Sequence, residues 1–153
     1  MEHLVPVLVI LAIVAFFMHK NIDKITSNID SLEDKSYELY AKYARIVERY
    51  IKDLQSNIEK NSVLVDEKYR LNDDIDAKEL TQNLSSLIRK LAFFETLQAK
   101  QKSKKELESD FFELLSSLDS IIQKGFKNGE NLADEIRDSL HDEYKKLKKT
   151  YML

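Results

Sequence analysis

Residues 22–58 read IDKITSNIDSLEDKSYELYAKYARIVERYIKDLQSNI. Apolar side chains recur there at alternating steps of three and four, and Ser36 fills the one gap. This spacing predicts an amphipathic helix whose a/d stripe runs for about five heptads and suits a partner helix. The predicted partner-helix stripe consists of Ile22, Ile25, Ile29, Leu32, Leu39, Tyr43, Val47, Tyr50, Leu54 and Ile58.

The segment before this stripe is apolar on every side. Residues 4–18, LVPVLVILAIVAFFM, contain no charged residue and no Asn, Gln, Ser or Thr. As a helix they span roughly 22 Å, and flanking residues extend them toward the about 20 residues of a membrane span. An uncleaved anchor is therefore predicted within residues 1–20. Its apolar side chains are Leu4, Val5, Val7, Leu8, Val9, Ile10, Leu11, Ile13, Val14, Phe16 and Phe17.

Two other interpretations of this segment stay open, a cleaved signal peptide and a buried core helix. The start is not basic and no A-x-A pattern follows Met18, which disfavours a signal peptide. A core helix would be polar on one face. Lys20 and Lys24 follow the segment and no Lys or Arg precedes it. The positive-inside rule then predicts that the chain after the anchor is cytoplasmic.

Three further amphipathic helices are predicted after a loop at residues 72–76. Their apolar positions are Leu80, Leu84, Leu87, Leu91, Phe94 and Leu97, then Leu107, Phe111, Leu114, Leu118 and Ile121 or Ile122, then Leu132, Ile136, Leu140, Tyr144, Leu147 and Tyr151. The predicted caps are Asp76 with Glu79, Ser103 with Glu106, Asn131 with Asp134, and Gly125 as a C-cap. The short connections favour antiparallel neighbours, so residues 21–153 are predicted to form an all-α bundle of about four helices.

Composition excludes several classes of site. The chain of 153 residues has two glycines, one proline and no cysteine, which excludes glycine-rich phosphate loops, disulfides and thiol chemistry. Its 24 basic and 27 acidic residues do not indicate nucleic-acid binding. No Glu-x-x-His motif occurs, and the helical neighbours of His141 are Arg137 and Lys145, which are not metal ligands. We predict no catalytic, metal or cofactor site.

Two further patterns have more than one interpretation. Tyr40, Tyr43 and Tyr50 approximate one helix face, and we expect boundary residues with buried rings and hydrated hydroxyls rather than a ligand-stacking surface. The last ten residues include four lysines. These are expected to complement the helix dipole, or alternatively to contact an anionic leaflet.

The stretch LTQNLSSLIRKLAFFETLQAKQ at residues 80–101 resembles the LemA family. The matching positions are Leu80, Thr81, Leu84, Leu87, Phe94, Leu97 and Ala99, with Ile29, Asp30, Tyr37, Glu38, Leu39, Val47 and Tyr50 upstream. The sequence departs from the family where Lys35 and Ser36 replace an arginine pair and where Ala41 and Glu95 replace prolines. The resemblance covers about residues 26–101 and implies a membrane-anchored helical protein without an established reaction.

The leading hypothesis is a single-pass membrane protein whose cytoplasmic bundle binds partner proteins as a scaffold or adaptor, without catalysis. Its expected partners are the lipid bilayer and other, membrane-associated proteins, but not nucleic acid. A self-associating structural coiled coil, and hence a homo-oligomer, is the alternative. A second alternative is a LemA-like membrane protein of unassigned biochemical role.

Overall fold

The computed structural model describes residue 13 and residues 29–61, 63 and 66–151. The chain forms two compact units, residues 1–32 and 33–153. Its long helices are α2 (Ile29–Asn61), α3 (Ala77–Ala92), α5 (Lys104–Gly125) and α6 (Gly129–Tyr151). Three short helical turns join them, η2 (Glu67–Tyr69), η3 (Phe93–Glu95) and α4 (Leu97–Lys100).

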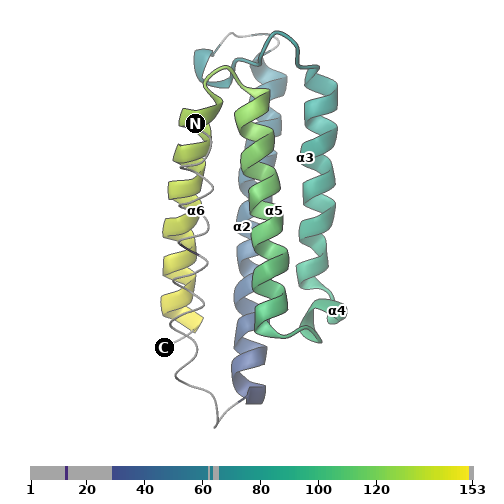
Figure 1. The fold of residues 1–153 in the computed structure, drawn as a ribbon, viewed down its shortest axis with the longest axis vertical. Coiled ribbons are helices and arrows are strands. Elements are labelled where there is room, and N and C mark those ends of the chain that lie inside the picture. The colour runs from purple at the N-terminus through teal and green to yellow at the C-terminus, as the bar shows by residue number, and fades with distance from the viewer. Residues whose placement is uncertain (1–12, 14–28, 62, 64–65, 152–153) are drawn as a thin grey trace. The chain divides into compact units, whose positions relative to one another are not determined.

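Within residues 33–153 the four long helices form an antiparallel up-and-down bundle (Figure 1). No strand occurs in the described part, where Leu71 and Phe126 form an isolated β-bridge. The predicted all-α bundle is therefore confirmed. Apart from Ile13, the predicted anchor side chains lie outside the described residues. Across the described ranges, no helix combines the length and the apolar character that crossing a membrane requires.

Polar caps fix the starts of α3 and α5. The Asp76 carboxylate accepts a hydrogen bond from the Lys78 backbone at 3.0 Å, which satisfies one of the free N–H groups of the first turn. Ser103 and Glu106 form a reciprocal capping box at the start of α5, as their spacing predicts. These two helix starts could be located from the sequence because each cap lies within three residues of its partner.

The break after α3 departs from the prediction of one helix through Leu97. The Thr96 hydroxyl donates to the Phe93 carbonyl at 2.6 Å and accepts from the Ala99 backbone at 3.3 Å. Thr96 thus ends one turn and caps the next, since its backbone is extended. As a result Leu97 is 79% exposed instead of lying in the core.

The glycines act by close approach and not by left-handed backbone geometry. Gly125 is the last residue of α5, and neither glycine has a positive φ, so the predicted glycine C-cap is wrong. A Cβ at Gly125 would lie 2.9 Å from the side chain of Leu80. A Cβ at Gly129 would lie 2.4 Å from the Gln123 carbonyl oxygen. Gly129 therefore lets α6 start directly against the end of α5.

The start of α6 also differs from the prediction. The helix begins at Gly129, and the Leu132 backbone donates to the Asn128 carbonyl at 3.0 Å. Asn131 therefore lies inside the first turn and not at the cap. Asp134 binds Arg137 at 2.7 Å instead of completing a capping box.

Replacing Gly129 by alanine is expected to lower the free energy of unfolding by about 1–3 kcal/mol, because the new methyl group meets fixed backbone. Gly125→Ala is the matched control. Its methyl group meets only the tip of Leu80, and the higher helix propensity of alanine offsets about 1 kcal/mol. Urea unfolding of the full chain, followed by circular dichroism, measures both variants. Equal losses of stability in the two variants would contradict the conclusion that only Gly129 is packed against fixed backbone.

Candidate functional site

The predicted partner-helix stripe packs inside the chain's own bundle over its described part. Leu39, Tyr43, Val47, Leu54 and Ile58 are buried, and Tyr50 is half-buried. The side chains of Ile22, Ile25, Ile29 and Leu32 lie outside the described residues. From Leu39 onward, the stripe therefore packs against the rest of the bundle, apart from Tyr50 and Leu54, which also line a cleft.

Aromatic side chains form the core at the end of the bundle where α2 enters. The Tyr43 ring stacks on Phe111 at a centroid distance of 4.7 Å, and Phe94 meets Phe111 edge-on at 4.8 Å. Tyr144 of α6 lies 5.3 Å from Tyr43. This cluster therefore joins α2, η3, α5 and α6 through two rings, those of Phe111 and Tyr43.

The tyrosine hydroxyls in this core are bonded to protein groups, so the prediction of hydrated boundary tyrosines is wrong for Tyr40 and Tyr43. The Tyr43 hydroxyl donates to the Leu140 carbonyl at 3.1 Å. The Tyr40 hydroxyl shares hydrogen bonds with Glu108 and Tyr144. Burial raises the pKa of Tyr40 and of Tyr43 far above the ordinary value near 10. Both tyrosines are therefore neutral structural groups.

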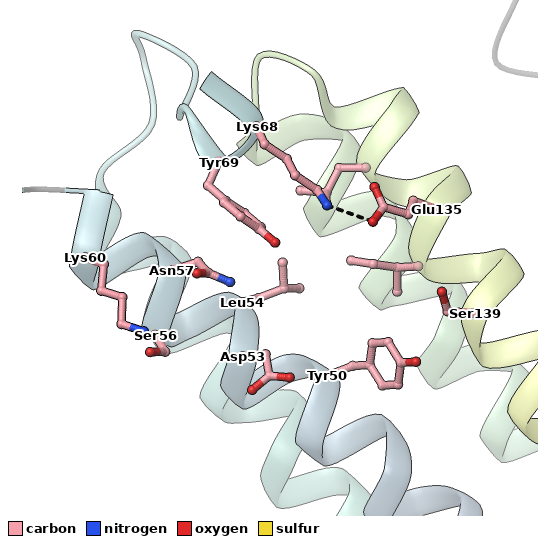
Figure 2. A pocket seen from close by; sticks show the side chains of 12 residues that line it. Tyr50, Asp53, Leu54, Ser56, Asn57, Lys60, Lys68, Tyr69, Glu135 and Ser139 are labelled. Carbon is pink, nitrogen blue, oxygen red and sulfur yellow. Dashed lines mark hydrogen bonds and ion pairs between the residues drawn. The ribbon is translucent and has the colours of Figure 1, made fainter. Parts of the chain in front are cut away.

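A polar cleft of about 250 Å³ opens at the opposite end of the bundle, between α2, η2 and α6 (Figure 2). The polar and aromatic residues that line it are Tyr50, Asp53, Ser56, Asn57, Lys60, Lys68, Tyr69, Glu135 and Ser139. Leu54, Leu132 and Ile136 form its apolar lining. The cleft therefore contains both charge signs, two aromatic rings and several neutral hydrogen-bonding groups.

The Lys68–Glu135 ion pair bridges η2 and α6 across the mouth of the cleft. Its Nζ–Oε1 distance is 2.7 Å, and Glu135 raises the pKa of Lys68. Both side chains are about half exposed, so the pair contributes little to stability. Tyr69 packs edge-on against buried Phe126, and its hydroxyl points toward the cleft (Figure 2). This geometry leaves the polar groups accessible while fixing where they lie.

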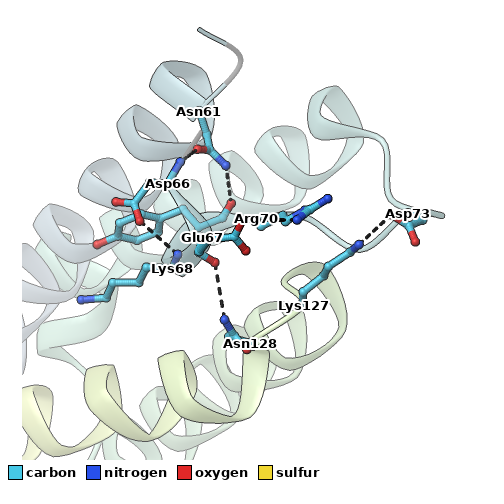
Figure 3. Close-up of polar contacts among 9 residues, drawn as sticks. Asn61, Asp66, Glu67, Lys68, Arg70, Asp73, Lys127 and Asn128 are labelled. Carbon is cyan, nitrogen blue, oxygen red and sulfur yellow. Dashed lines mark hydrogen bonds and ion pairs between the residues drawn. The ribbon is translucent and has the colours of Figure 1, made fainter. Parts of the chain in front are cut away.

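The loop that carries Lys68 and Tyr69 is held by side-chain amides (Figure 3). The Asn61 amide donates to the Tyr69 carbonyl at 3.0 Å, and its oxygen accepts from the Asp66 backbone. Asp66 in turn caps η2 by accepting from the Lys68 backbone at 3.0 Å. These contacts attach η2 to the last residue of α2.

A second set of contacts ties the same loop to the α5–α6 turn. The Asn72 amide donates to the Lys124 carbonyl at 2.7 Å and to the Phe126 carbonyl at 3.3 Å. It thereby gives a partner to the Lys124 carbonyl in the last turn of α5, where the helix leaves carbonyls unpaired. The Phe126 carbonyl also accepts from the Gly129 backbone at 3.1 Å. Lys127 binds Asp73 at 2.9 Å and lowers the pKa of that carboxyl group (Figure 3).

Sequence reasoning missed the cleft, because residues 61–76 have no periodicity and because Lys68, Asn72 and Asp73 bind partners more than 50 residues away along the chain. The one available signal is the group of asparagines that flank the loop, Asn61, Asn72 and Asn128. In the described part of the chain, no three His, Cys, Asp or Glu side chains gather as metal ligands. The cleft groups can bind polar or charged moieties through hydrogen bonds and ion pairs.

No protein-family model matches the chain, and no curated protein or solved structure is significantly similar to it. The LemA resemblance therefore stays a prediction from the residues quoted above.

Tyr43→Phe is expected to lower the free energy of unfolding by about 1 kcal/mol, because it removes a buried hydrogen bond. Tyr37→Phe is the matched control, since the Tyr37 hydroxyl donates to the Glu95 carbonyl at an exposed position. That variant is expected to change stability by less than about 0.5 kcal/mol. Denaturant unfolding measures the stability of the two variants. A larger loss for Tyr37→Phe would refute the stabilising role of the Tyr43 hydrogen bond.

The buried tyrosines also predict alkaline destabilisation. In the unfolded chain tyrosine ionises near pH 10, whereas burial keeps Tyr43 protonated to higher pH. The folded state then binds more protons, so stability falls as pH rises above about 10, by up to about 1.4 kcal/mol per unit for each such tyrosine. Tyr43→Phe should show a shallower decline. If the stability of Tyr43→Phe declined with pH as steeply as that of the unaltered chain, the pKa of Tyr43 would be the same in the folded and unfolded states.

Proposed function

We propose that the protein is a single-pass, membrane-anchored helical scaffold or adaptor that binds partner proteins on the cytoplasmic side and carries out no reaction. The apolar segment at residues 4–18 and the lysines after it support the anchor and its orientation. The polar cleft between α2, η2 and α6 is the observation that carries the binding role. In this proposal the partner contacts the cleft and not the buried stripe.

The size of the cleft favours side chains of a protein over a whole cofactor. The cleft volume of 250 Å³ equals that of roughly eight water molecules at liquid density. Small-molecule pockets are typically larger, at roughly 300–1,000 Å³. Such pockets are mainly apolar, whereas most residues that line this cleft are polar. One or two polar side chains of a partner segment fit this volume and these groups.

The exchangeable ion pair at the mouth suits recognition of a charged partner. Lys68 and Glu135 come from different elements and are half exposed, so a competing carboxylate or ammonium group can replace either one at small cost. Lys60 and Asp53 supply a further cation and anion on α2. If the LemA resemblance reflects common ancestry, it also supports a membrane-anchored helical protein with no established reaction.

Site-specific photo-crosslinking in cells tests this proposal. A photoreactive residue replaces Ser139 in the cleft, and the matched control replaces Asn83, an exposed residue on α3. The expected result is a defined heterologous adduct from position 139 and none from position 83. The adduct should weaken in Lys68→Glu, which places two acidic groups at the mouth of the cleft.

The double variant Lys68→Glu, Glu135→Lys separates recognition from folding. It restores an ion pair with reversed polarity, so it should keep the fold while the adduct stays weak. Adducts only to a second copy of the chain would favour the self-associating alternative. A monomeric pattern with no partner at position 139 would refute the adaptor role.

A further inference from the structure

One row of side chains on α2 forms the wall of the cleft that faces α6. Tyr50, Asp53, Asn57 and Lys60 follow steps of three, four and three, which places them on one face of the helix. Asp53 and Lys60 are seven residues apart, so two helical turns and about 10 Å of rise separate this anion from this cation. We call these four residues the α2 row.

The polar side chains of the α2 row are available to groups from outside the chain. Asp53 and Lys60 are exposed, and neither forms an ion pair with any residue that the structure describes. The Asn57 amide points toward the cleft and forms no hydrogen bond with the described part of the chain (Figure 2). The other two charges of the cleft differ in this respect, because Lys68 and Glu135 bind each other at 2.7 Å.

The facing wall of the cleft neutralises neither end of the α2 row. From α6, Glu135 and Ser139 supply the polar lining. Glu135 is held by Lys68 and Ser139 is uncharged. An incoming segment therefore meets an unmatched anion at one end of the row and an unmatched cation at the other.

Helix stability accounts for one of these two charges. Lys60 lies in the last turn of α2, where the helix dipole favours a cation. Asp53 lies more than two turns before that end, beyond the reach of the dipole, and aspartate is among the weaker helix formers. The position of Asp53 in the wall of a cleft is therefore better explained by what it contacts than by the helix that carries it.

We propose that the partner of the cleft is a helix that carries an acidic and a basic side chain one heptad apart and lies along the α2 row. Its basic side chain meets Asp53 and its acidic side chain meets Lys60. This proposal rests on the adaptor role proposed above and specifies the chemistry of the partner. A segment with charges of one sign would be attracted by one end of the row and repelled by the other.

Helical geometry supports a spacing of seven residues in the partner. Two helices that lie side by side rise equally per turn, so charges two turns apart on one match charges two turns apart on the other. In coiled coils, charged residues that flank the seam select the partner and its orientation in this way. The cleft volume of about 250 Å³ admits one or two side chains, so the partner's backbone stays outside the mouth.

Charge reversal at each end of the α2 row, combined with the photo-crosslink at position 139, tests this proposal in the full chain. Asp53→Lys would repel the basic side chain of the partner, and Lys60→Glu would repel its acidic side chain. Each variant is expected to lower the adduct yield about twofold to tenfold, since each replaces a weak exposed attraction by a repulsion.

Glu113→Lys on α5 and Lys90→Glu on α3 are the matched controls. Both residues are exposed and lie outside the cleft, so these variants make the same charge changes without altering the row. They should leave the adduct yield unchanged. Circular dichroism of all four variants confirms that they remain folded.

The signs of the two effects separate the alternatives. A purely basic partner would crosslink more strongly to Lys60→Glu, and a purely acidic partner would crosslink more strongly to Asp53→Lys. Either gain would overturn the proposal, as would an unchanged yield in both variants. In each of these cases the adduct itself persists, so the adaptor role would stay supported.

Mass spectrometry of the adduct identifies the partner segment directly. The cross-linked segment should contain an acid and a base seven residues apart, and a segment without such a pair would overturn the proposal. If position 139 gives no adduct in the chain with an unaltered row, the adaptor role and this proposal both fail. An adduct to a second copy refutes the adaptor role alone, because the two reversals then show whether the α2 row pairs with opposite charges of that copy.

Discussion

Burial of one face of α2 is the constraint on which the rest of the bundle depends. Every other long helix contacts this face or its margin. Gln55 of α2 donates to the Thr81 carbonyl and to the Ser85 hydroxyl of α3. Tyr43 stacks on Phe111 of α5 and donates to the Leu140 carbonyl of α6. Because helix stability in proteins comes mostly from packing of an amphipathic face, removing this face would expose the apolar side chains that α3, α5 and α6 pack against it.

The sequence predicts those features that depend on residues close together in the chain. The stripe from Leu39 to Ile58 and the Ser103–Glu106 capping box both follow from spacing within one or two turns. The break at Thr96 could not be predicted in this way, because apolar positions continue on both sides of it. The hydroxyl of Thr96 bonds the Phe93 carbonyl on one side and the Ala99 backbone on the other, and the apolar spacing gives no sign of either contact. The early start of α6 likewise depends on the close approach of Gly129 to α5.

The cleft was unpredictable for a related reason. Its position depends on η2, and η2 is held by amides that reach across the fold. Asn72 donates to carbonyls 52 and 54 residues away. Asn61 bonds the Asp66 backbone before η2 and the Tyr69 carbonyl at its end. Two of these bonds satisfy half-buried carbonyls, those of Tyr69 and Phe126. A buried polar group without a partner costs about 1–3 kcal/mol. In the sequence these asparagines look like ordinary loop residues.

The two ends of the bundle are chemically different, and the packed core fixes their separation. Antiparallel helices largely cancel one another's dipoles, so the asymmetry comes from side chains. From Tyr43 to Asn57, α2 rises about 21 Å, so the aromatic cluster around Phe111 and the cleft lie at different levels of the same bundle. Since close-packed interiors deform little, the packed core holds the residues of the cleft in fixed relative positions. A rigid bundle therefore presents the cleft groups of α2, η2 and α6 in one arrangement, which is what the proposed recognition of a partner's side chains would require.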